Sequence, residues 1–229
     1  MGSSTERVLV SWSGGKDSTL ALNEIVKNGT YRVAALVTTV TADYDRISMH
    51  GVRRALLEQQ AASLGLPLEK VFIPSNASNA VYEQNFESVL AKYAGQGVQK
   101  VVFGDLFLED LRKYREERLA SVGMSGVFPI WMRGTKELAK SLISLGFKAI
   151  TTCVDTNVLD KDFVGRLVDE KFLADLPASV DPCGENGEYH SFVHDGPIFS
   201  EAVRFTIGEK VLRDERFYFC DLVPAQEVR

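Results

Sequence analysis

A turn of small, charged and hydroxyl residues, SGGKDS at positions 13–18, follows the apolar stretch VLVSW directly. Its two glycines lack a Cβ, so the backbone can take positive φ there and approach a ligand closely. A helical pattern starts at Asp17, and the free N–H groups and dipole of a helix start favour an anion. We therefore expect a phosphate-binding turn, with a plain capped connection as the alternative. The residues expected to hold the nucleotide here are Ser11, Ser13, Gly14, Gly15, Lys16, Asp17 and Ser18.

The aspartate in this turn, Asp17, restricts which ligands the turn can bind. Lys16 supplies a cation for a phosphate, whereas Asp17 would repel a bare phosphate and makes sense if Mg²⁺ lies between them. The P-loop pattern GxxxxGK[ST] is excluded because Asp17 follows the lysine, and GxGxxG is absent from this turn. We expect Lys16 and Asp17 to take part in catalysis, with Asp17 as the magnesium contact.

A second polar group lies far along the chain, in DPCGENGEYHSFVHDGPIF at 181–199. The glutamates at 185 and 188 suit the orientation of an amine or the removal of a proton, although a solvated glycine-rich loop is an equal alternative. Zinc is disfavoured, because the spacing of His190 and His194 does not belong to an HExxH helix. Cys183 has no recognisable base partner. The residues expected to be catalytic or to bind substrate here are Glu185, Gly187, Glu188, Tyr189 and His190.

Further candidates follow other apolar runs. Gly104 and Asp105 come after VVF, and ligands of open α/β sheets bind outside the carboxyl ends of the strands, so Asp105 is expected to contact ribose, base or magnesium. A helix-capping aspartate is an equal alternative. The run 33–40, which includes Val37, is expected to contact adenine through its backbone. Substrate contacts are also assigned to His50, Arg115 and Glu117.

The elements that position these residues alternate between strand and helix patterns. Continuous apolar strands predict a parallel sheet covered on both faces, hence a doubly wound α/β fold. Residues 1–155 are expected to form this domain and residues 156–229 a smaller α+β substrate region. Strands are predicted at 8–12, 33–40, 68–73, 101–103, 127–130 and 149–154, and helices at 17–28, 49–64, 79–96, 109–122 and 134–145.

Composition restricts the class of protein. Lys plus Arg is 26 and Asp plus Glu is 31, so the net charge is 26 − 31 = −5, which argues against a nucleic-acid-coating protein. Three widely spaced cysteines without a CxxC pair favour a reducing compartment over a disulfide framework. No apolar run reaches membrane-spanning length. We expect a soluble cytoplasmic protein.

Together these segments resemble a known family. SGGKDS looks like the PP-loop of the ATP pyrophosphatases, with an adenine nucleotide alpha hydrolase-like, Rossmann-like fold. CGENGEYHSFVHDGPIF looks like the C-terminal signature of the diphthine–ammonia ligase (diphthamide synthase) family. The motifs that match in order are SGGKDS, GDL at 104–106, RxE at 115–117, PIW at 129–131, GFKAI at 146–150 and FVGRLVD at 163–169.

The resemblance implies a function. Residues 13–18 would hold the pyrophosphate portion of ATP, and ATP with Mg²⁺ would adenylate a carboxylate that ammonia then amidates. Diphthine, a modified histidine on elongation factor 2, is the implied acceptor. A homodimer with a second copy of the chain is a further expectation.

Two segments depart from the pattern. RISMHGVRRALL replaces a tyrosine- and methionine-rich segment and resembles a branch found in organisms without diphthamide, and Asn186 replaces a common glycine. The alternatives are an ATP pyrophosphatase with another acceptor, including tRNA thiolation, and a nucleotide-binding sensor.

Overall fold

The computed structural model describes residues 5–48 and 50–225, and these form two compact units that interleave along the chain. The parallel-sheet unit runs up to Ser13 and includes Asp17–Asp45 and Leu66–Met132. The antiparallel-sheet unit contains Gly14–Lys16, Arg46–Gly65 and the chain from Arg133 onward. The expected division at 155/156 stays a prediction.

The parallel-sheet unit has the doubly wound α/β architecture that the sequence predicts. Its strands lie in the order β4-β2-β1-β5-β6, and all four pairings are parallel. The strands are β1 (Glu6–Ser11), β2 (Tyr31–Thr41), β4 (Leu68–Ile73), β5 (Lys100–Val102) and β6 (Ser125–Val127). The helices are α1 (Lys16–Asn28), α3 (Asn79–Ala94) and α4 (Glu109–Ala120).

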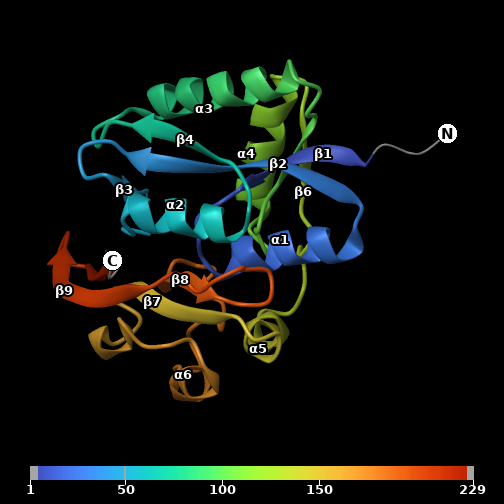
Figure 1. Ribbon diagram of the computed structural model, residues 1–229. Coiled ribbons are helices and arrows are strands. Elements are labelled where there is room, and N and C mark those ends of the chain that lie inside the picture. The colour runs from blue at the N-terminus through green and yellow to red at the C-terminus, as the bar shows by residue number, and fades with distance from the viewer. Residues whose placement is uncertain (1–4, 49, 226–229) are drawn as a thin grey trace. The chain divides into compact units, whose positions relative to one another are not determined.

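Both faces of this sheet are covered, which is why its strands are continuously apolar. Figure 1 shows α3 and α1 on opposite sides of the sheet. Successive strand residues point to opposite faces: Leu9 and Val101 pack with Leu90 of α3 and Leu119 of α4 in one core cluster. The predicted strand at 127–130 lies two to three residues early, at Ser125–Val127.

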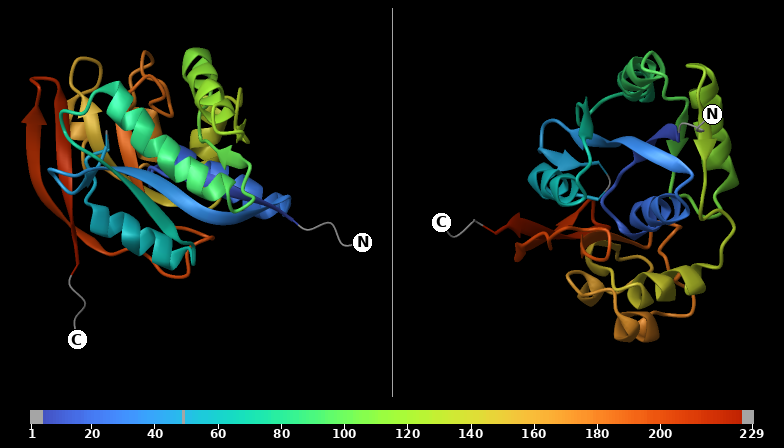
Figure 2. Two further views of the ribbon diagram at one scale, coloured as in Figure 1. Left: turned by 90° about the horizontal axis from the view of Figure 1, so that it is seen from above. Right: turned by 45° about the vertical axis from the view of Figure 1, so that its right-hand side comes forward.

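The antiparallel-sheet unit is built on the strand order β8-β7-β10-β9. Its strands are β7 (Lys148–Asp155), β8 (Tyr189–Asp195), β9 (Phe205–Arg213) and β10 (Phe217–Pro224), with the short β3 at Arg46–Ile47. The helices are α2 (Arg54–Ser63), α5 (Thr135–Ser144), α6 (Glu170–Asp175) and the short 3-10 helix η1 (Lys161–Phe163). Figure 1 places α2 on one side of this sheet and α5 and α6 on the other, and Figure 2 shows β9 and β10 as a long hairpin.

The strand predicted at 149–154 is present as β7, but it belongs to the antiparallel sheet and not to the parallel one. β7 pairs antiparallel with β8 and β10 and takes no part in the parallel sheet. Seven of its eight residues are buried, because helices cover both faces of this sheet as well. An antiparallel strand covered on both faces has the same continuous apolar pattern as a parallel one, so the pattern could not separate the two.

Glycines lie just beyond the C-terminal ends of four helices. The glycines that follow four of the helices have φ between 63° and 86°, the left-handed region that favours glycine. They are Gly29, Gly65, Gly123 and Gly146. α2 is shorter than expected and starts at Arg54, because Arg46–Ile47 form β3 and Arg53 has an extended backbone at the helix start.

Candidate active site

The glycine turn joins β1 to α1 as predicted. Gly14 has a φ of 77°, and its carbonyl accepts hydrogen bonds from Val193 N at 2.9 Å and from Gln60 Nε2 at 3.0 Å. A Cβ at Gly14 would lie 2.6 Å from Gln60 Oε1, so a larger residue would collide with the side chain that holds the Gly14 carbonyl. The turn is therefore held in shape by α2 and β8 of the same unit.

Gln60 holds the glycine turn in place, and it was not predicted from the sequence. Its side chain is fully buried and bridges two carbonyls, those of Gly14 and, at 2.5 Å, Val193. A signal was present: Gln60 follows Leu56 and Leu57 by three or four positions, on the apolar face of the helix. A polar residue on a buried face needs a partner, and here the partner is the glycine turn at Gly14.

Lys16 is buried, with 3% of its surface exposed. Its backbone N–H donates to Ser191 Oγ at 3.3 Å, and its ammonium lies over the Tyr189 ring, 4.9 Å from the ring centroid. A cation over an aromatic face is stabilised by about 0.5–2 kcal/mol, which offsets part of the cost of burying it. Lys16 and Tyr189, predicted separately for nucleotide and substrate, therefore lie in contact.

Two histidines predicted to bind substrate are brought together. The rings of His50 and His190 lie 4.6 Å apart at a 44° tilt. Removal from water, and then the charges of His190 and Lys16, hold the pKa of His50 well below 6.5. Removal from water, with Lys16 second, lowers the pKa of His190 to about 4. Both imidazoles are therefore neutral at pH 7 and can accept protons or hydrogen bonds.

The two glutamates have different surroundings. Glu188 is buried, and its carboxylate accepts three hydrogen bonds from its own loop: from Asp181 N (3.0 Å), Asn186 N (2.9 Å) and Asn186 Nδ2 (3.0 Å). This geometry makes Glu188 the organiser of the loop, and its expected catalytic role stays a prediction. Glu185 is half-buried, and its backbone N–H donates to Asp181 Oδ1 at 3.2 Å. Gly187 has a φ of 89°, which suits glycine.

The parallel-sheet unit holds the remaining candidates. The Arg115 guanidinium lies 2.7 Å from Asp105 and 4.5 Å from the Phe103 ring centroid, so these charges are matched. Glu117 is exposed on α4. Gly104 does permit a close approach, but of the protein itself: a Cβ there would lie 2.7 Å from the Asp17 carbonyl carbon.

The turn residues in this unit are close to one another. The hydroxyls of Ser13 and Ser18 lie 3.2 Å apart. Ser11 is in register with Val37 on the neighbouring strand, and the Val37 carbonyl accepts from Trp12 N at 2.8 Å. Asp17 is in the first turn of α1.

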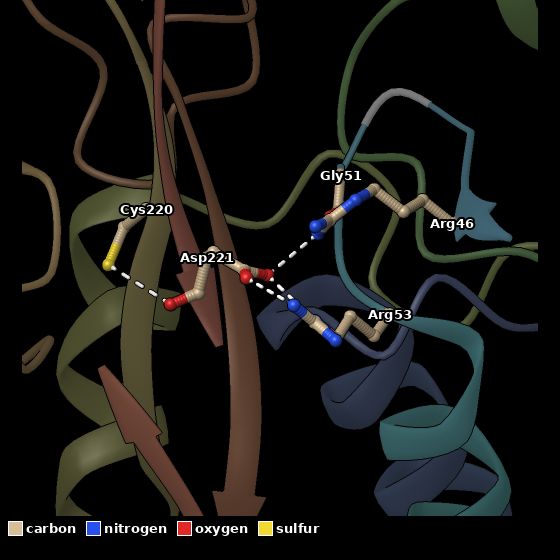
Figure 3. Close-up of polar contacts among 5 residues, drawn as sticks. All are labelled: Arg46, Gly51, Arg53, Cys220 and Asp221. Atoms are coloured by element: carbon tan, nitrogen blue, oxygen red, sulfur yellow. Dashed lines mark hydrogen bonds and ion pairs between the residues drawn. The ribbon is translucent and has the colours of Figure 1, made fainter. Parts of the chain in front are cut away.

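The two arginines that follow His50 form ion pairs within the protein. Arg53 is held by Asp221 of β10 through Nε (3.0 Å) and Nη2 (2.7 Å), and Arg46 donates to the same carboxylate at 2.8 Å (Figure 3). Arg54 pairs with Glu58 on its own helix at 2.6 Å. The guanidinium groups of Arg53 and Arg54 therefore already face carboxylates of the protein. Arg46 and Asp221 were missed, since their separation in sequence gives no signal.

The cysteines are buried thiols without disulfides, as predicted. Burial raises the pKa of Cys153 to about 12. Cys183 lies against the Thr135 carbonyl, 3.2 Å away, in the interior of the loop. These surroundings suit packing rather than sulfur transfer.

Comparisons with known proteins decide the family. A model described as the diphthamide synthase N-terminal domain matches residues 6–126, and one described as the diphthamide synthase C-terminal domain matches residues 134–227. The chain belongs to the diphthamide synthase family. The predicted family is thereby confirmed.

Several relatives that share one name are similar to this chain along most of its length. The chain is 25% identical over 229 residues to diphthine–ammonia ligase of Homo sapiens and 26% identical over 228 residues to that of Bos taurus. Each match covers 90% of this chain and 85% of the relative. The relative from Danio rerio is 25% identical, with 91% of this chain and 90% of the relative covered.

Two features are absent from residues 5–48 and 50–225. No helix in this part of the chain is long and apolar enough to cross a membrane. In the same residues no group of three or more His, Cys, Asp or Glu side chains could hold a metal ion.

Proposed function

We propose that this protein is an ATP-dependent ligase that activates a carboxylate as its adenylate and amidates it with ammonia. The observation that carries the proposal is that both family models match in order, over the segments that contain Lys16 and Glu185. The relatives are named diphthine–ammonia ligase, so diphthine is the acceptor we propose, carried by elongation factor 2.

The chain's own residues suit this chemistry. The turn at 13–18 would bind the phosphates, with Lys16 stabilising the charge that develops on pyrophosphate as the carboxylate oxygen attacks the α-phosphorus. Adenylation converts a poor leaving group into AMP. Ammonia then attacks the acyl carbon, AMP departs, and a proton must be removed from the new nitrogen. Magnesium, when bound, would neutralise phosphate charge beside Asp17.

The glycine-rich loop near Glu185 supports an acceptor site. Glu188 fixes the loop, Tyr189 donates to the Pro182 carbonyl at 2.7 Å, and Glu185 is then the carboxylate we assign to orienting the acceptor or the amine. No feature of the buried thiols favours thiolation.

The test is an assay with ATP, Mg²⁺, ammonium and elongation factor 2 that carries diphthine. We expect AMP, pyrophosphate and amide in equal amounts, all dependent on the acceptor. Formation of ADP and phosphate, or ATP binding without turnover, would contradict the proposal.

A pair of variants sharpens this test. Asp17→Ala removes an acid from the first turn of α1 and should abolish turnover, whereas Asp110→Ala removes one from the first turn of α4 and should not. Equal effects of the two changes would mean that Asp17 acts only as a helix-start acid.

A further inference from the structure

The loop between β3 and α2 carries His50 to its contact with His190, and it is attached to the C-terminal strand at two points. Arg46 and Arg53 stand at its two ends, and both donate to the Asp221 carboxylate of β10 (Figure 3). Arg46 also donates to the Gly51 carbonyl at 2.7 Å, which closes the loop on itself. One carboxylate thus ties both ends of the segment that contains His50.

The second attachment is steric. Gly51 has a φ of 67°, and a Cβ there would lie 2.7 Å from Phe219 Cδ1. The residue next to His50 therefore rests directly on a side chain of β10. The attachments are two residues apart on that strand, at Phe219 and Asp221.

The sheet register places these attachments beside His190. Phe219 of β10 is paired with Cys153 of β7, and Cys153 is paired with His190 of β8. The row that holds the loop therefore continues across the sheet to the second imidazole. This arrangement sets the 4.6 Å separation between the two rings.

The surroundings of His50 leave one ring nitrogen available. Among the described residues, its buried Nδ1 has no hydrogen-bond partner. The charged and titratable groups that act on the ring are His190 of β8 and Lys16 at the phosphate-binding turn, and a backbone hydrogen bond links the ring to Ser191. A buried polar atom without a partner is costly, which suits a group that meets its partner only during the reaction.

We propose that His50 of the His50–His190 pair accepts the proton released when ammonia displaces AMP, and that Asp221 is the positioning residue that holds His50 there. This inference rests on the proposed function. As the C–N bond forms, the bond from the acyl carbon to the AMP oxygen breaks and AMP leaves with its electron pair. The proton on the new amide nitrogen passes to the His50 imidazole, and no oxidant or reductant takes part.

The environment matches that task. Desolvation, and then the charges of His190 and Lys16, lower the pKa of His50, so the imidazole is a weak base that is unprotonated at pH 7 and takes its proton from a strongly acidic donor, the N-protonated amide. ATP phosphates beside Lys16 would oppose the effect of its charge and make the imidazole a stronger base when nucleotide is bound.

The experiment follows a single turnover, with the full chain in excess over diphthine-bearing elongation factor 2 and with ATP, Mg²⁺ and ammonium, and it measures pyrophosphate release and amide formation separately. His50→Gln should lower amide formation by about 10²-fold or more, the usual contribution of a general base. Pyrophosphate release should fall much less, and hydroxylamine, a stronger nucleophile, should trap the accumulated acyl-adenylate as hydroxamate. Amide formation at the wild-type rate would overturn the inference, and so would equal loss of both products.

Asp221→Asn tests the positioning role. It should lower amide formation by about tenfold to 10²-fold through misplacement of the loop. It should also shift the acidic limb of the amidation rate and the NMR titration of His50 toward pH 6.5, because a released imidazole regains water. An unchanged His50 titration would overturn the positioning role.

The matched control is Asp175→Asn, which removes another carboxylate between two cations, Arg166 at 2.6 Å and Lys171 at 2.9 Å. It should change neither rate nor titration, and an effect equal to that of Asp221→Asn would overturn the positioning role. If wild-type protein releases no acceptor-dependent pyrophosphate, the proposed function is wrong, and so is the role of His50 that rests on it. If wild-type protein works and His50→Gln amidates normally, only this inference fails.

Discussion

Two polar clusters of this protein handle buried charge in opposite ways. In the parallel-sheet unit, Asp105 and Arg115 lie 2.7 Å apart, and each neutralises the other. In the antiparallel-sheet unit, the Lys16 ammonium lies over an aromatic ring and acts on two imidazoles whose pKa values are lowered. A matched ion pair stabilises structure, whereas neutral imidazoles beside a cation keep the capacity to accept protons and anions. The comparison indicates chemistry at the second cluster and support at the first.

The largest expected effect comes from removing the cation of the second cluster. Lys16→Met keeps an unbranched side chain over Tyr189 but removes the charge, so acceptor-dependent pyrophosphate release should fall by about 10²-fold or more. The control is Lys27→Met, at the exposed end of the same helix. Circular dichroism should show both variants folded, and a Lys16→Met enzyme with a wild-type rate would remove the basis of the comparison.

His190→Gln tests whether the imidazoles are neutral. The pKa of His190 is about 4 in the folded protein against 6.5 as its ordinary value, so the unfolded chain binds more protons between these values. Stability from this group is therefore present above pH 6.5 and is lost as the pH falls, by about 2 kcal/mol at pH 5. Urea unfolding at pH 7.5 and pH 5 should show a smaller drop in the variant. Equal drops would mean that His190 is charged in the folded state.

Asp105→Asn tests the first cluster. The Asp105 and Arg115 side chains are 10% and 27% exposed, so removing one charge should cost about 1–3 kcal/mol, between the values for surface and buried pairs. The exposed pair Arg112–Glu116 supplies the control: Glu116→Gln should cost about 0.5 kcal/mol or less. A large rise in KM for ATP at unchanged stability would instead make Asp105 a nucleotide contact.

The smallest effect is expected at Tyr189. Tyr189→Phe removes the hydrogen bond to Pro182 and keeps the ring under Lys16, so it should cost about 0.5–1.5 kcal/mol in unfolding free energy. Tyr189→Leu removes the ring as well and should weaken ATP binding more than Tyr189→Phe does. Equal ATP affinities in the two variants would show that the ring does not support the cation.

Several parts of this protein could be predicted from its sequence. The tight turn between β1 and α1 was recognisable because two glycines directly follow an apolar strand and precede a helical pattern, and its binding of phosphate stays a prediction. The helix ends were recognisable because Gly29, Gly65, Gly123 and Gly146 take a conformation that disfavours other residues. The parallel sheet followed from strands that are apolar on both faces. These are local properties, and local sequence determines them.

Other features depend on contacts between distant segments. The sheet to which β7 belongs was mispredicted because burial on both faces does not depend on the direction of the neighbouring strand. The pairing of Arg53 could not be predicted because its partner, Asp221, is 168 residues away. The same applies to Gln60 and its bond to Gly14, 46 residues apart.

The sequence by itself determined the family, the glycine turn at 13–18 and the loop that contains Glu185. Only the tertiary structure decided that Arg53 is paired, that Glu188 organises its own loop, and that His50 meets His190. Motifs record residues that act through their own chemistry and short spacing. The charge state and accessibility of a side chain depend on what surrounds it, and the folded chain supplies those surroundings from segments that are distant in sequence.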